Sequence, residues 1–414
     1  MSSRHVGAGS GLSEAESTYA WLRLTASLLI GTIGSVGMWS VVVVLPAVQA
    51  EFGVDRANAS LPYTVTLLSV AVGSMLMGQL VDRFGIVYPV VGGAFALCLG
   101  YLATSQATSI WQFALLHGVV IGFFGSSVMF APLIADISHW FTRHRGIAVA
   151  ICASGSYMAG TVWPPIVQHL VDTAGWRQAH IVIGLVCIAV ILPLTLALRR
   201  PPPRQEMSAA AIAAAGAQNR LGISSNMLLG LLIVAGVSCC VAMSMPQVHI
   251  VAYCGDLGYG AARGAEMLSL MLGFGVISRL ASGWIADKIG GLGTVLLGSA
   301  LQALALILYV PYDGLASLYV ISALFGLSQG GIVPSYAIVV REYFSPGVAG
   351  ARVGTVLMST MLGMALGGWL SGVLYDMTGS YQAAFVNGIL WNVLNVAIIA
   401  WLLIRKRAMQ VAAA

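Results

Sequence analysis

A single arginine stands deep within an apolar stretch of the sequence. Arg279 lies in the run LGFGVISRLASGW, eight residues before Asp287, which is roughly 12 Å along a helix. A charged side chain at the centre of a bilayer costs at least about 2.5–3.5 kcal/mol, so such a residue indicates a function. A guanidinium stays charged and can grip a carboxylate through two parallel hydrogen bonds. We therefore expect Arg279 to have a function, and its chemistry suits the binding of an anion; the alternatives are a structural ion pair and an arginine that reaches the membrane surface.

Several uncharged polar residues also lie in apolar runs and are candidates for the same cavity. Those that we expect to contact the substrate are His117, Tyr157, Gln329, Tyr336 and Ser359. For His117, the alternatives are a proton shuttle and a hydrogen-bonded structural histidine. For the other four, ordinary hydrogen bonding between helices is the alternative.

The composition places these residues in a membrane protein. The 414 residues are 58% hydrophobic and only 8% charged, whereas a soluble domain carries roughly 25% charged residues. A lipid bilayer can hide so much apolar surface, because lipid is itself an apolar phase. The 49 glycines turn up inside apolar runs, as is typical of membrane helices whose backbones approach closely.

The sequence contains no motif for covalent or metal chemistry. We find no Gly-x-Ser-x-Gly elbow, no phosphate-binding loop and no cluster of metal ligands. The six cysteines lie in or beside apolar runs, with spacing that suggests neither disulfides nor a zinc site. The polar segment Met1–Ala20 has no apolar core and is not a cleavable signal peptide. We expect neither an enzyme nor a cofactor, a metal or a nucleic-acid partner.

Twelve apolar runs are each near the roughly 20 residues that one bilayer crossing needs. They cover 22–48, 60–81, 87–105, 110–135, 146–168, 178–198, 227–254, 264–286, 291–311, 315–340, 350–374 and 382–404. Only the connection Arg199–Ser225 is long, and it opens with RRPPPR, whose prolines end the preceding helix. The expected organisation is a six-helix half at 1–198, a linker at 199–225 and a second half at 226–414.

The basic residues predict how the chain is oriented. Of the 19 Lys and Arg residues, fifteen fall on the side that holds both termini, three (Arg56, Arg177 and Arg263) fall on the other side, and Arg279 lies within a span. Because positive residues accumulate in cytoplasmic loops, both termini are expected in the cytoplasm. The predicted location is the inner cell membrane.

Two pairs of segments repeat at nearly the same offset. Gly78–Gly85 (GQLVDRFG) corresponds to Gly283–Gly290 (GWIADKIG) at an offset of 205, and Leu170–Gly175 (LVDTAG) corresponds to Leu374–Gly379 (LYDMTG) at 204. Such agreement at matching places indicates two similar six-helix halves.

The first repeated pair resembles the signature loop of the major facilitator superfamily. The similarity covers about residues 20–405 and implies an all-α membrane protein with twelve transmembrane helices in two pseudo-symmetric halves. Asp82, Arg83, Asp287 and Lys288 are then expected at a gate. The basic residues that usually follow the last glycine are absent, since Ile86-Val87-Tyr88 stands there.

A narrower similarity begins at Trp140. The segment WFTRHRGIAVAICASG (Trp140–Gly155) resembles the helix 4–5 signature of monocarboxylate transporters, with Arg143 and Arg145 in its basic cluster. The family's other signature, an acidic and glycine-rich run at the start of helix 1, is absent.

The resemblance implies that Arg279 binds the substrate carboxylate and that Asp256, at the outer end of helix 7, takes part in proton coupling. In a straight hairpin Asp256 would lie on the order of 20 Å from Arg279, and an exposed acid at a helix end is the alternative.

These features predict a monomeric, proton-coupled transporter of small monocarboxylates such as lactate or pyruvate, working by alternating access. The run for helix 11 holds no deep Lys or Arg, so one fixed positive charge favours cargo with one negative charge. The alternatives are an anion exchanger of the oxalate–formate type and a membrane sensor that transports nothing.

Overall fold

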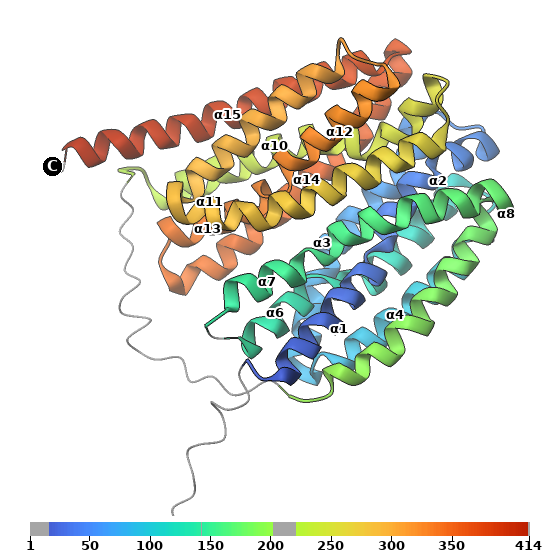
Figure 1. Cartoon of the computed structure of the whole chain (residues 1–414), viewed down its shortest axis with the longest axis horizontal. Coiled ribbons are helices and arrows are strands. Elements are labelled where there is room, and N and C mark those ends of the chain that lie inside the picture. The colour runs from blue at the N-terminus through green and yellow to red at the C-terminus, as the bar shows by residue number, and fades with distance from the viewer. Residues whose placement is uncertain (1–15, 142, 202–220, 413–414) are drawn as a thin grey trace, which may run out of the picture.

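The computed structural model describes residues 16–141, 143–201 and 221–412, and every regular element in these ranges is a helix (Figure 1). The predicted all-α fold is confirmed.

The first set of helices is α1 (Thr18–Gly34), α2 (Val36–Phe52), α3 (Arg56–Phe84), α4 (Val87–Thr104), α5 (Ile110–Leu115), η1 (Leu116–Gly125), η2 (Ser126–Met129), α6 (Ala131–Trp140), α7 (Arg145–Ala153), α8 (Gly155–Leu194) and η3 (Thr195–Leu198). The second set is α10 (Ser225–Asp256), α11 (Ala261–Tyr309), α12 (Leu315–Gln329), α13 (Ile332–Tyr343), α14 (Pro346–Thr378) and α15 (Tyr381–Ala412). Most of the predicted linker lies outside the described residues.

Ten helical segments of the described chain are long and apolar enough to cross a membrane. Two of them, Gly146–Leu198 with 53 residues and Ala261–Tyr309 with 49 residues, are about twice as long as one crossing requires. Each is broken by one glycine with non-helical angles, Gly175 (φ 81°, ψ 160°) and Gly290 (φ 78°, ψ 167°). Each long segment is thus a pair of helices, and the ten segments are consistent with twelve crossings.

The backbone supports the internal repeat. Gly85 has φ 78° and ψ 168°, and Gly290, which corresponds to it in the second repeat, has φ 78° and ψ 167°. Side chains other than hydrogen rarely tolerate such positive φ angles, so both turns require glycine. The two signature loops therefore share a conformation as well as a motif.

The two sets of helices lie side by side (Figure 1), with α1–α8 in blue to green and α10–α15 in yellow to red. They meet chiefly where α3 packs on α14 and where α8 packs on α11. At Gly372 of α14 an added Cβ would come within 2.9 Å of the Cα of Ala57, so only glycine permits this approach. α6 and α13 pack mainly within their own sets. We call the end of the bundle that holds Glu16 and the end of α15 the terminal side, and the other end the distal side.

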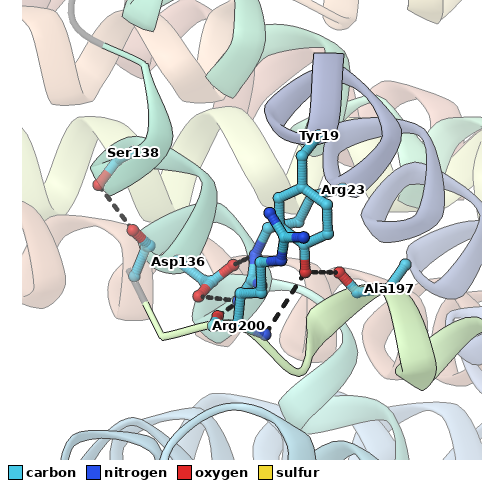
Figure 2. Close-up of polar contacts among 7 residues, drawn as sticks. Tyr19, Arg23, Asp136, Ser138, Ala197 and Arg200 are labelled. Atoms are coloured by element: carbon cyan, nitrogen blue, oxygen red, sulfur yellow. Dashed lines mark hydrogen bonds and ion pairs between the residues drawn. The ribbon is translucent and has the colours of Figure 1, made fainter. Parts of the chain in front are cut away.

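A buried ion pair holds α1 to α6 near the terminal side (Figure 2). Arg23 donates to Asp136 through Nε (2.8 Å) and Nη2 (2.7 Å), and its Nη1 donates to the carbonyl of Arg200 (2.9 Å). Its guanidinium also stacks on Trp140, 4.7 Å from the ring centroid. Arg23 is one of the fifteen basic residues that the sequence assigns to the side holding both termini, and in the structure it is 0% exposed. Asp136 neutralises this charge inside the protein.

We predict that Asp136→Asn lowers the stability of the protein by about 3–5 kcal/mol, because it leaves the Arg23 guanidinium buried without a counter-charge. Thermal unfolding in detergent measures this change. The control is Glu266→Gln, which breaks a surface pair with Arg263 and should have little effect. Equal melting temperatures for the two variants would contradict the prediction.

Candidate functional site

Arg279 lies in the first half of α11, at the boundary between the two sets of helices. Its Nε donates to the carbonyl of Gly330 (3.2 Å), which follows α12, and its Nη1 donates to the carbonyl of Ala153 (2.8 Å) at the end of α7. The residue is 8% exposed, and no carboxylate of the described residues pairs with it. Two backbone carbonyls therefore accept hydrogen bonds from its positive charge, and no carboxylate of the described residues balances it.

The aromatic ring of Tyr157 forms one wall beside this charge. The guanidinium carbon of Arg279 lies 4.1 Å from the ring centroid, in a cation–π arrangement. Tyr157 belongs to α8, and its ring packs on Gly275 of α11, where an added Cβ would come within 2.5 Å of the ring. The glycine one turn before Arg279 thus lets a ring from the other set of helices reach the cation.

Two buried glutamines bond to each other between α10 and the end of α12. Gln329, the residue before Gly330, accepts a hydrogen bond from Nε2 of Gln247 on α10 at 2.8 Å. The remaining polar atoms of the two amides are buried and have no partner among the described residues. Whichever way the two amides are turned, one donor and one acceptor stay unpaired. This pair can therefore bind a further polar group that both donates and accepts.

Tyr63 on α3 adds a third polar group near the boundary. Its ring packs on Gly368 of α14, and its side chain lies near those of Tyr157 and Cys240. The hydroxyl is buried without a partner among the residues described here. Tyr63 and Gln247 are not among the predicted substrate contacts, although each is a polar residue within an apolar run.

Asp256 lies at the distal end of α10, which stays helical up to this residue. Its two carboxylate oxygens are 3.2 and 3.3 Å from Nη2 of Arg56, at the start of α3 in the other set. On the same side the carboxylate of Asp376 accepts from the backbone N–H groups of Arg56 (2.9 Å) and Ala57 (2.7 Å). We call these contacts the distal latch. Asp256 therefore pairs with Arg56, and in the described structure Arg279 has other partners.

A chain of hydrogen bonds leads inward from the latch. Nη1 of Arg56 donates to the hydroxyl of Tyr381 (2.9 Å), which lies 3.0 Å from Nδ1 of His249. Nε2 of His249 lies 2.8 Å from the carbonyl of Gly368. Because a carbonyl only accepts, Nε2 carries the proton, and the Tyr381 hydroxyl donates to Nδ1. The Gly368 carbonyl thus fixes the tautomer of this buried histidine, and the Tyr381 hydroxyl connects it to the latch.

The other predicted substrate contacts bond within their own set of helices. The Tyr336 hydroxyl donates to Asn395 (2.7 Å), and the Ser359 hydroxyl donates to the carbonyl of Val356 (2.7 Å). His117 lies among α3, α4 and α8, next to Thr66 and Tyr101. Of the predicted set, the structure brings Tyr157 against Arg279, while Gln329 directly precedes Gly330, whose carbonyl Arg279 contacts.

The predicted gate residues line the terminal side and are exposed to solvent. Asp82, Arg83, Asp287, Lys288 and Arg143 all have exposed side chains. Arg83 and Lys288 lie over aromatic rings of their own helices. For Arg145, the structure describes the helical backbone and not the side chain. Beside this cluster the backbone N–H of His144 donates to the carboxylate of Glu16 (2.8 Å), which lowers the pKa of that carboxyl.

Comparison with known proteins agrees with this architecture. Monocarboxylate transporter 13 of Bos taurus is 28% identical over 372 residues, with 87% of this chain and 83% of that protein covered. An uncharacterised transporter of Bacillus subtilis, YcxA, is 26% identical, with 81% and 83% covered. The crystal structure of a bacterial homologue of the human lysosomal transporter Spinster, inward-facing and unoccupied, shares the fold with a TM-score of 0.67 at 16% identity, with 96% and 98% covered.

The family follows from a match over most of the chain. The profile of the Major Facilitator Superfamily matches residues 27–315. The helical membrane fold and the repeated signature loops agree with this match. The chain belongs to the Major Facilitator Superfamily and is a multi-pass membrane transporter.

Proposed function

We propose that this transporter carries small monocarboxylates, of the size of lactate or pyruvate, together with protons. The observation that carries the proposal is the buried charge of Arg279, which lies between the two sets of helices without a carboxylate among the described residues. Its partners are two backbone carbonyls, which a substrate carboxylate would outcompete because an ionised acceptor forms stronger hydrogen bonds. The relatives named as monocarboxylate transporters support the same class of cargo.

The number of unpaired charges favours a single negative charge on the cargo. Arg23 and Arg56 are also buried, but Asp136 and Asp256 neutralise them. Arg279 therefore provides one net positive charge at the boundary, and one carboxylate balances it. The unpaired donor and acceptor of Gln247 and Gln329 would suit a hydroxyl or keto group beside that carboxylate.

We infer an alternating-access cycle in which the distal latch closes one end of the pathway. With the termini in the cytoplasm, as the basic residues predict, the latch faces outward and its opening admits substrate. Protonation of Asp256 would remove the charge that holds Arg56. Acid outside would then favour opening, which links the latch to proton-coupled uptake. Asp82, Arg83, Asp287, Lys288, Arg143 and Arg145 remain the predicted gate on the cytoplasmic side.

We predict that Arg279→Gln lowers lactate uptake into proteoliposomes by at least about 30-fold, the equivalent of roughly 2 kcal/mol, because a buried anion loses its cation. Arg279→Lys should also be impaired, since an ammonium cannot form the two parallel bonds. Arg263→Gln, at an exposed distal position, is the control. Uptake by Arg279→Gln at the control rate would refute the binding assignment.

We predict that Asp256→Asn weakens the dependence of uptake on external pH, because a neutral amide at the latch no longer responds to protons. Uptake measured with and without a pH gradient tests this. Exchange of internal for external lactate serves as the control, since it needs no net proton movement. A wild-type pH profile in this variant would remove Asp256 from the coupling role.

The same assay decides between the rival functions. Uptake that requires an internal organic anion would identify an exchanger of the oxalate–formate type. A correctly folded protein without flux of any tested acid would identify a sensor.

A further inference from the structure

Two buried histidines lie together in the first set of helices, away from Arg279. His117 lies on η1 and His180 on the second part of α8, and their ring centroids are 6.1 Å apart. Both residues are 0% exposed. The rings of Tyr101, Phe113 and Trp176 surround the pair, with Phe113 stacked on His117 at 5.7 Å and an interplanar angle of 16°.

The hydrogen bonds of the other ring nitrogens fix both tautomers. The Thr66 hydroxyl donates its only proton to the carbonyl of Pro62 (2.6 Å), so it must accept the bond from Nδ1 of His117 (3.1 Å). Nδ1 of His180 lies 2.9 Å from the carbonyl of Trp176 and must donate to it. In neutral histidines both Nε2 atoms are therefore bare acceptors.

Neither Nε2 atom has a partner among the described residues. Buried polar atoms without partners are rare in native proteins and call for an explanation. Two acceptors cannot bond to each other, so burial of both in one aromatic enclosure is unfavourable unless a donor joins them. One water molecule has two hydrogens and can therefore donate to both nitrogens.

We propose that His117 and His180 form a site that binds one proton through a single bridging water, and that this proton is the one carried with the substrate. The second part of the proposal rests on the proposed function. A direct N–H···N bond would bring the centroids to roughly 5 Å, so at the observed 6.1 Å a molecule must join the two rings, and water is the smallest that donates to both nitrogens. In the neutral state the water donates to both nitrogens. When a proton arrives, one imidazolium donates to the water, and the water donates to the other imidazole.

The surroundings allow such a charge. The faces of the aromatic rings attract a cation. From α2, Glu51 accepts a hydrogen bond from Nε1 of Trp176 and pairs with Arg177 (2.6 Å), so a carboxylate and a guanidinium of the distal side flank the site. The other titratable groups around it are the Tyr101 hydroxyl of α4, bonded to Ser40 of α2, and the Cys187 thiol of α8, while α3 contributes Thr66.

The helix that carries His117 is unusual. Residues Leu116–Gly125 form a π-helix of ten residues, whereas π-helices mostly occur as single turns and often at functional sites. A π-helix changes the direction of side chains relative to a regular α-helix. The position of the His117 side chain therefore depends on this irregular backbone.

A proton count tests the site without any assumption about the cargo. We expect the full-length protein in phosphatidylcholine nanodiscs to take up one proton more between about pH 8 and 5 than His117→Gln, His180→Gln or the double variant. The three variants should be alike, because either histidine alone cannot hold the shared proton. No difference from the wild type, or a loss of one proton per histidine replaced, overturns the proposal. The control is His169→Gln, at an exposed position of α8. It measures the proton uptake that is lost when an ordinary exposed histidine is replaced.

Nitrogen-15 spectra of labelled wild-type protein keep the site testable if a variant fails to fold. The expected result is that the Nε2 signals of both residues shift in one common step. Two Nε2 atoms that stay unprotonated down to pH 5 would overturn the proposal.

Transport then tests the link to coupling. His117→Gln and His180→Gln should lose proton-driven lactate accumulation while lactate exchange stays within about two-fold of the wild type, and His169→Gln should keep both. Wild-type accumulation in the two variants would separate this site from coupling. Wild-type protein without lactate uptake would contradict the proposed function instead, while the proton count would still decide on the site.

Discussion

Three buried arginines and the way each charge is balanced determine how this protein is organised. A guanidinium in a low-dielectric interior must be paired or heavily hydrogen-bonded. Arg23 has Asp136 within its own set of helices, and Arg56 has Asp256 in the opposite set. Arg279 has only carbonyl oxygens and an aromatic face. The first pair stabilises one half, the second joins the halves, and the third leaves a charge for a ligand to balance.

The sequence predicted the features that depend on local composition. Apolar runs of sufficient length identify the helices, and the paired signature loops identify the repeat, because both patterns are contiguous. Arg279 was selected since no basic residue is expected at that depth, and the structure does bury it. Tyr157 is predicted for the same kind of reason and lies beside it, whereas Gln329 bonds to Gln247 on α10.

The sequence did not reveal partnerships between distant residues. Arg23 and Asp136 are 113 positions apart, and Arg56 and Asp256 are 200 apart. Each of these residues stands near the end of an apolar run, where contact with water is the ordinary expectation. Tertiary packing shields the two arginines from that water. α1 packs on α6 around Arg23, and the rings of Tyr375 and Tyr381 lie over Arg56. The unpaired Nε2 atoms of His117 and His180 likewise follow from tertiary structure, because the Nδ1 atom of each ring donates to a nearby oxygen.

The hydrogen bonds that Asp376 accepts have a consequence for how the sequence of this transporter can evolve. Its carboxylate holds main-chain N–H groups of residues 56 and 57 rather than their side chains. Every amino acid except proline supplies that N–H. Substitution at position 57 can therefore leave this contact intact, whereas a change at Asp376 itself removes it. Position 56 must also keep the side chain that pairs with Asp256. Natural variants should tolerate diversity at position 57 and little at positions 56 and 376.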